Sequence, residues 1–122
     1  VAGATRDGGV ILIATECLEG FGSEEYRAVF EHVTTPEAFI EKLMKKEFFL
    51  PDQWCAQETY QVMLKNEIWV HTQGIDADTL QRFHFKPVAN ISEAIAALLG
   101  RFGADARWAI VPDGPLLILK VD

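Results

Sequence analysis

Several residue types and patterns are rare or missing in this sequence, and each absence excludes a class of protein. The 122 residues include two cysteines, too few for a disulfide-dense mini-protein. No apolar run approaches the ~20 residues that a membrane-spanning helix needs. No basic segment followed by an apolar stretch suggests a signal peptide. These absences predict a cytoplasmic protein with free thiols that binds no membrane.

Positive charge is also scarce. Eleven Lys and Arg residues stand against 18 Asp and Glu residues, which gives a formal net charge of −7. The only adjacent basic residues are Lys45 and Lys46. Because binding to a phosphate backbone needs a basic face, the sequence predicts no nucleic-acid partner.

Common catalytic motifs are missing as well. There is no Gly-x-Ser-x-Gly elbow, and the glycine-containing loop before Ser23 lacks the pattern of a P-loop or a dinucleotide fingerprint. A phosphatase loop of the Cys-x5-Arg type that began at Cys17 would need arginine at position 23, where this sequence has Ser23. This class of phosphatase is therefore not supported. The three histidines, His32, His71 and His84, lack metal-ligand spacing, so we expect no metal site within this chain.

What the sequence does contain is an alternation of strands and helices. Short apolar runs predict strands at residues 10–15, 68–72 and 86–89. The predicted helices follow the capping residues Ser23, Thr35, Asp52, Asp76 and either Asn90 or Ser92. This order predicts an α/β fold: a three-layer sandwich with a mostly parallel, twisted sheet and helices on both faces.

The C-terminal part predicts one further element. Residues 107–111 and 116–121 are apolar and flank a Pro-Asp-Gly-Pro turn at 112–115. This pattern predicts an antiparallel hairpin at an edge of the sheet. No linker divides the chain, so residues 1–122 are expected to form a single domain.

Ligands of parallel α/β sheets bind outside the carboxyl ends of the strands. This rule directs attention to the loop at 16–22, the turn near 72–74 and the turn at 112–115. The loop at 16–22 is either a simple tight turn or a gate for substrate. A second candidate is Trp54, in the first turn of a predicted helix, where Gln53 and Gln57 share one face. Composition alone favours the simpler interpretation, in which Trp54 packs against the sheet and attaches this helix to it.

Four segments together resemble the C-terminal domain of the nickel-dependent lactate racemase (LarA) family. They are DGGVILI at 7–13, ECLEGFG at 16–22, DQWCAQ at 52–57 and IVPDG at 110–114. The segments occur in the same order as in the family and span nearly the whole chain. The resemblance implies that the chain is the C-terminal domain of a larger LarA-like enzyme whose N-terminal, cofactor-binding domain is absent here.

The resemblance also implies an activity. Such enzymes are racemases or epimerases that invert the α-carbon of a 2-hydroxy acid with a nickel-pincer nucleotide, which a lysine and a histidine of the N-terminal domain hold. Two histidines of that domain act as general base and acid. The C-terminal domain closes over the N-terminal domain and completes the active site. The alternative is a non-catalytic, stand-alone ligand-binding or protein-interaction module.

Few functional residues carry over from the family to this sequence. The family's pocket tryptophan corresponds to Trp54, which would wall the pocket together with Gln53 and Gln57. The residues expected to border the cleft are those of the loop: Glu16, Cys17, Glu19, Gly20 and Gly22. Glu19 stands where the family usually has Asp, and Phe21 where a small aliphatic residue is common. The resemblance therefore implies a 2-hydroxy acid without specifying which one.

We expect the isolated chain to show no racemisation, because the resemblance assigns the cofactor, the catalytic residues and the metal to the absent domain. Chiral chromatography of D-lactate, L-lactate and longer 2-hydroxy acids, incubated with the chain and nickel, measures this. Turnover above the protein-free blank would contradict the expectation.

Overall fold

A three-stranded parallel sheet lies at the centre of the computed structural model, which describes residues 2–46 and 49–116. Its strands, in spatial order, are β1 (Val10–Ala14), β2 (Glu67–His71) and β3 (Lys86–Pro87). β1 and β2 pair along their whole length, and β3 adds a short pairing on the other side of β2. The three predicted strands are confirmed, with ends that differ by one or two residues.

Five α-helices are found in the described residues: α1 (Glu24–Glu31), α2 (Pro36–Met44), α3 (Gln53–Met63), α4 (Ala77–Arg82) and α5 (Ile91–Phe102). Four of them begin as the sequence predicts. The side chains of Ser23, Thr35, Asp76 and Asn90 each accept a hydrogen bond from a backbone N–H of the following first turn. Asn90, and not Ser92, is the cap of α5.

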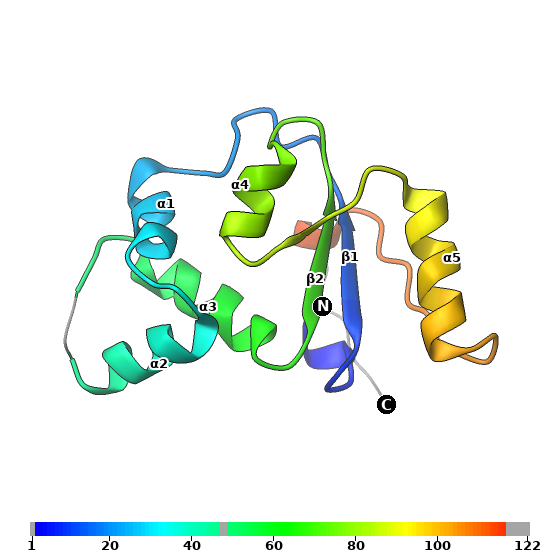
Figure 1. The fold of residues 1–122 in the computed structure, drawn as a ribbon, viewed down its shortest axis with the longest axis horizontal. Coiled ribbons are helices and arrows are strands. Elements are labelled where there is room, and N and C mark those ends of the chain that lie inside the picture. Colours follow the sequence, from blue (N-terminus) through cyan, green and yellow to red (C-terminus); the bar gives the residue numbers. More distant parts are fainter. Residues whose placement is uncertain (1, 47–48, 117–122) are drawn as a thin grey trace.

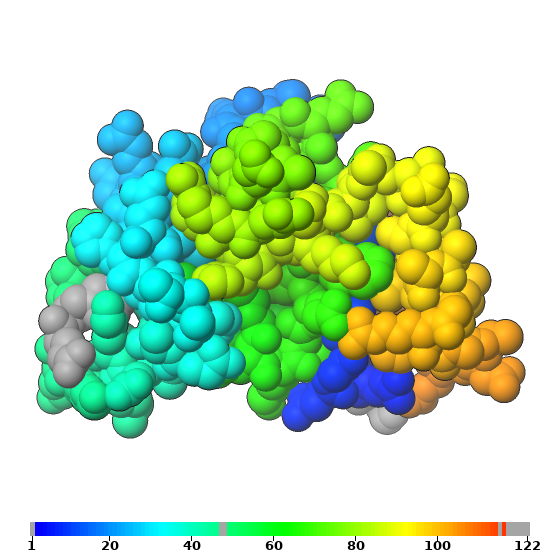
Figure 2. Space-filling model, viewed as in Figure 1, coloured from blue at the N-terminus to red at the C-terminus, as the bar shows by residue number. Residues whose placement is uncertain are grey.

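Helices cover both faces of the sheet, as predicted. Alternation along β2 sends Ile68 and Val70 to one face, where they pack against Leu80 of α4. Trp69 points to the opposite face and packs against Ala94 and Leu98 of α5. In the space-filling view the sheet is only partly visible between α4 and α5 (Figure 2). The three-layer α/β arrangement follows from this alternation.

Helices α1, α2 and α3 form a group beside the sheet, on the side away from α5 (Figure 1). Their core is largely aromatic: Phe30, Phe39, Tyr60 and Phe83 are buried and in contact. The ring centroids of Phe39 and Tyr60 lie 4.7 Å apart in a stacked pair. Phe83, which follows α4, connects this aromatic core to the helix layer on the sheet.

The predicted C-terminal hairpin is not found. Residues 107–111 form no strand, and Ile110 is almost fully exposed. The second predicted strand, 116–121, lies almost entirely outside the described residues. An apolar run becomes a strand only when a partner accepts its backbone hydrogen bonds, and 107–111 makes none with the sheet in the described part of the chain. All strand pairs of the described residues are parallel.

A matched pair of Phe-to-Ala substitutions tests the aromatic core. Phe83 is fully buried, so Phe83→Ala is expected to lower the free energy of unfolding by about 3–5 kcal/mol. Phe49 is 87% exposed, so Phe49→Ala is expected to change it by less than about 0.5 kcal/mol. Urea melts of both variants measure the difference, and equal midpoints would contradict the described packing.

Candidate functional site

The loops that follow β1 and β2 meet at the carboxyl edge of the sheet, at the upper edge of Figure 1. The Thr15 amide donates to the His71 carbonyl at 3.0 Å, one residue beyond the last pair of the ladder. The Gly74 amide and the Thr72 hydroxyl both donate to the Glu16 carbonyl, at 3.0 and 2.8 Å. These bonds join the two loops into one surface.

Gly74 allows the closest approach between the two loops. A Cβ atom at this position would lie 1.9 Å from the carbonyl oxygen of Cys17, well inside any real contact distance. Cys17 itself has φ 49°, and its carbonyl accepts the Gly20 amide at 2.8 Å. The loop thus turns tightly over Gly74, at a position where no larger residue fits without a backbone shift.

Phe21 anchors the far end of the same loop. Its ring lies against the rings of Phe30 and Phe83, with centroids 5.4 and 4.6 Å away. The flanking residues Gly20 and Gly22 have φ 76° and 91°, a conformation that glycine adopts at little cost. Phe21 is therefore packed against the aromatic core.

A polar contact ties the end of this loop to the start of α3. The Ser23 hydroxyl donates to a carboxylate oxygen of Asp52 at 2.9 Å while it caps α1. Asp52 does not cap α3 with its side chain, and its backbone is left-handed at φ 57°. The predicted helix start is correct, but this carboxylate serves a contact 29 residues back in the chain.

Trp54 is 68% exposed in the first turn of α3. It therefore does not attach the helix to the sheet, which was the expectation from composition; Ala56 and Tyr60 provide the buried face of α3. Gln53 turns its side-chain oxygen back to accept the Leu50 amide at 2.9 Å, so it stabilises the turn before α3. Gln57 is half-buried.

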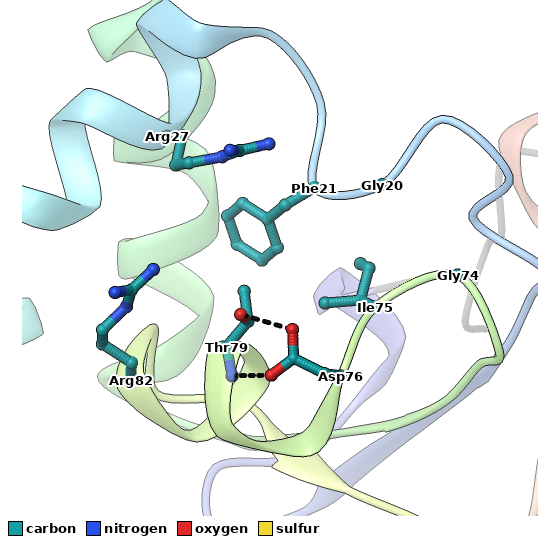
Figure 3. Close-up of a pocket in the computed structure, with 8 residues that line it drawn as sticks. All are labelled: Gly20, Phe21, Arg27, Gly74, Ile75, Asp76, Thr79 and Arg82. Carbon is teal, nitrogen blue, oxygen red and sulfur yellow. Dashed lines mark hydrogen bonds between the residues drawn. The ribbon is translucent and has the colours of Figure 1, made fainter.

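Two hollows lie at the edge where the loops meet. A depression of about 440 Å³ is lined by Thr15, Glu16, Leu18, His71, Thr72, Gln73 and Gly74. A smaller one of about 160 Å³ lies beside it, with Gly74 in both walls (Figure 3). The structure thus brings Glu16 to the first hollow and Gly20 to the second. Neither hollow includes Trp54, Gln53, Gln57, Cys17, Glu19 or Gly22 among its lining residues.

The turn at 72–74, which the strand-end rule had marked, lines the larger hollow, but His71 was not among the candidate residues. The signal for His71 was its place at the carboxyl end of the second predicted strand. Nδ1 of His71 lies 2.9 Å from the Val88 carbonyl. Since a carbonyl oxygen only accepts, Nδ1 is the donor of this hydrogen bond.

The described residues contain no group of three or more His, Cys, Asp or Glu side chains placed to hold a metal ion. Both cysteines are free thiols of intermediate burial. Across the described part of the chain, each helix is too short or too polar to cross a membrane.

The architecture defines a class of protein: a parallel α/β domain whose strand-end loops are joined into one surface. Residues 2–119 match the sequence profile of the family described as the Lactate racemase C-terminal domain. The chain belongs to this family, as its sequence motifs suggested.

Individual relatives agree with this assignment. The chain is 27% identical over 119 residues to the lactate racemase of Thermoanaerobacterium thermosaccharolyticum, and 24% identical over 117 residues to that of Lactiplantibacillus plantarum. The alignments cover 96% and 94% of this chain but 28% of each relative. The solved structure of the T. thermosaccharolyticum apoprotein superposes with a TM-score of 0.85 at 26% identity, over 98% of this chain and 29% of that one. The chain therefore spans less than a third of the length of these relatives.

The exposure of Trp54 predicts a small effect on stability when it is removed. Trp54→Ala is expected to lower the free energy of unfolding by about 1 kcal/mol or less. The matched control, Trp69→Ala, removes an indole that is only 5% exposed and is expected to cost about 3–5 kcal/mol. Denaturant melts of the two variants compare them directly. A collapsed midpoint for Trp54→Ala would show that Trp54 is a core residue.

Proposed function

We propose that this chain is the closing domain of a 2-hydroxy-acid racemase or epimerase. The observation that carries the proposal is the family match over residues 2–119, in a chain that spans 28% of each curated relative. Both relatives are named lactate racemases. The remainder of such an enzyme supplies the natural partner, an N-terminal domain of the same polypeptide.

The proposal places the nickel-pincer nucleotide mainly on the N-terminal domain. What supports this is that the described residues of this chain offer no group of three or more His, Cys, Asp or Glu side chains placed to hold a metal ion. Cys17 and Cys55 lie on different elements, and the Cys17 sulfur is 4.0 Å from the Thr15 hydroxyl. The proposal therefore assigns no chemical step to this chain.

In this proposal the contribution of the chain is to position substrate and to exclude water. Trp54 offers a broad apolar surface with one N–H donor. The Ser23–Asp52 hydrogen bond fixes the start of its helix relative to the 16–22 loop. With a second domain docked on this side, the indole walls the pocket, while Gln53 holds the turn and Gln57 flanks it. Excluding water strengthens every electrostatic interaction at the reacting carbon.

The loop at 16–22 is proposed to border the same cleft. Glu16, Cys17, Glu19, Gly20 and Gly22 all belong to the segment that Gly74 and Phe21 hold in place. The exposed Leu18 adds an apolar tip to this segment. A rigid loop of this kind positions a partner surface without paying an ordering entropy on docking.

A domain exchange tests the proposal. The T. thermosaccharolyticum enzyme is prepared with this chain in place of its own C-terminal domain, and racemisation of lactate and longer 2-hydroxy acids is followed by chiral chromatography. We expect turnover with at least one of these acids. Trp54→Ala in the chimera should lower turnover by about tenfold or more, because a lost wall loosens the substrate. Leu116→Ala, which also truncates an exposed apolar residue, should leave turnover unchanged.

Equal turnover in the chimera and its Trp54→Ala variant would contradict the role of Trp54. A chimera that folds, as shown by circular dichroism, and racemises no 2-hydroxy acid would favour a stand-alone module. The coding sequence upstream of Val1 provides a test that does not depend on folding. A second domain read in the same frame supports the proposal, and a start codon directly before Val1 without such a domain contradicts it.

A further inference from the structure

The smaller hollow is lined by two arginine side chains from different helices. Arg27 projects from α1 and Arg82 from the last turn of α4, with the Phe21 ring between them (Figure 3). Gly20 and Gly74 form part of the rim, where the lack of side chains leaves the hollow accessible. Its volume of about 160 Å³ exceeds the ~30 Å³ that one water occupies, so a polyatomic group fits.

Neither guanidinium is neutralised by a carboxylate in the described residues. Nε of Arg27 is buried and has no hydrogen-bond partner. Arg82 contacts the face of the Phe83 ring, with its guanidinium carbon 4.8 Å from the centroid. The chain as a whole carries a net charge of −7, whereas this hollow is lined by two guanidiniums that have no carboxylate partner among the described residues.

The one carboxylate that lines the hollow is committed elsewhere. Asp76 caps α4: its two oxygens accept the Thr79 amide at 2.8 Å and the Thr79 hydroxyl at 2.7 Å. The hydrogen bond from the Thr79 amide has the larger effect and that from the Thr79 hydroxyl the smaller. Both lower the pKa of the Asp76 carboxyl below its usual value. Asp76 is therefore charged at neutral pH and bonded to Thr79, and it forms no ion pair with either arginine.

We propose that this hollow, which Arg27 and Arg82 both line, binds a small oxyanion, a carboxylate or phosphate group. Arginine presents several N–H donors in a planar fork that matches both anions, and such charge-assisted hydrogen bonds are stronger than neutral ones. Because Nε of Arg27 is buried, the terminal N–H groups of the two guanidiniums are the donors that an oxyanion would meet. The site goes beyond the proposed function, because it includes neither Trp54 nor either flanking glutamine.

An NMR titration of the 122-residue chain tests the site. Inorganic phosphate and acetate are added in separate arms, with ionic strength held constant by chloride. We expect saturable shifts of the Gly20 and Gly74 amides and of the Arg27 Nε resonance. The arm that saturates at the lower concentration identifies the preferred anion. Shifts that grow linearly in both arms would overturn the proposal.

Charge-changing variants separate binding from a structural role. Arg27→Gln and Arg82→Gln should each weaken binding by about tenfold or more. Arg27→Lys, which keeps the charge but not the fork, should fall between Arg27→Gln and the unmodified chain. Asp76→Asn keeps an acceptor for the cap and removes a negative charge from the wall, so it should tighten binding by about threefold.

Two controls complete the experiment. Arg107→Gln makes the same charge change at an exposed position outside the hollow and should leave the affinity unchanged. Trp54→Ala should also leave it unchanged, so this result is independent of the proposed racemase role. Dispersed amide spectra report that each variant is folded. Equal affinities for the chain, Arg27→Gln and Arg82→Gln would overturn the proposal, as would weaker binding by Asp76→Asn.

Discussion

The close approach of Gly74 to the Cys17 carbonyl is the constraint on which the strand-end surface depends. Parallel strands end at the same edge of a sheet, but their loops can diverge from there. Here the Glu16 carbonyl accepts two hydrogen bonds from the opposite loop, and Gly74 has no Cβ to prevent the contact. The same contact forms a shared wall between the two hollows. One small residue thus determines the shape of the whole edge.

A second set of contacts connects the loop at this edge of the sheet to the helices α1 and α3 beside it. Phe21 inserts into the aromatic core, and Ser23 joins the end of the loop to Asp52 before α3. The position of Trp54 relative to the sheet therefore depends on a loop more than thirty residues away in sequence. If Trp54 walls a pocket, as proposed, these contacts position its helix although the indole itself is exposed.

The two proposals share Gly20 of the 16–22 loop but rely on different side chains. The racemase role relies on exposed apolar surface, which is useful only when another domain covers it. The oxyanion site relies on two arginines that line one hollow. The racemase proposal leaves the metal to another part of the enzyme, since the described residues offer no group of metal ligands and the chain spans less than a third of the length of its relatives.

The sequence by itself determined the features that depend on neighbours along the chain. Strand runs, helix caps at Ser23, Thr35 and Asp76, and the family motifs were all readable, because apolar periodicity and capping act within a few residues. For α5 the sequence left Asn90 and Ser92 open, and the structure shows Asn90 as the cap. Only the tertiary structure decided that Trp54 is exposed, that Asp52 bonds to Ser23, and that 107–111 is not a strand. It also decided that Arg27 and Arg82 share a hollow. These outcomes depend on which distant segment supplies a partner, and local pattern contains no information about that choice.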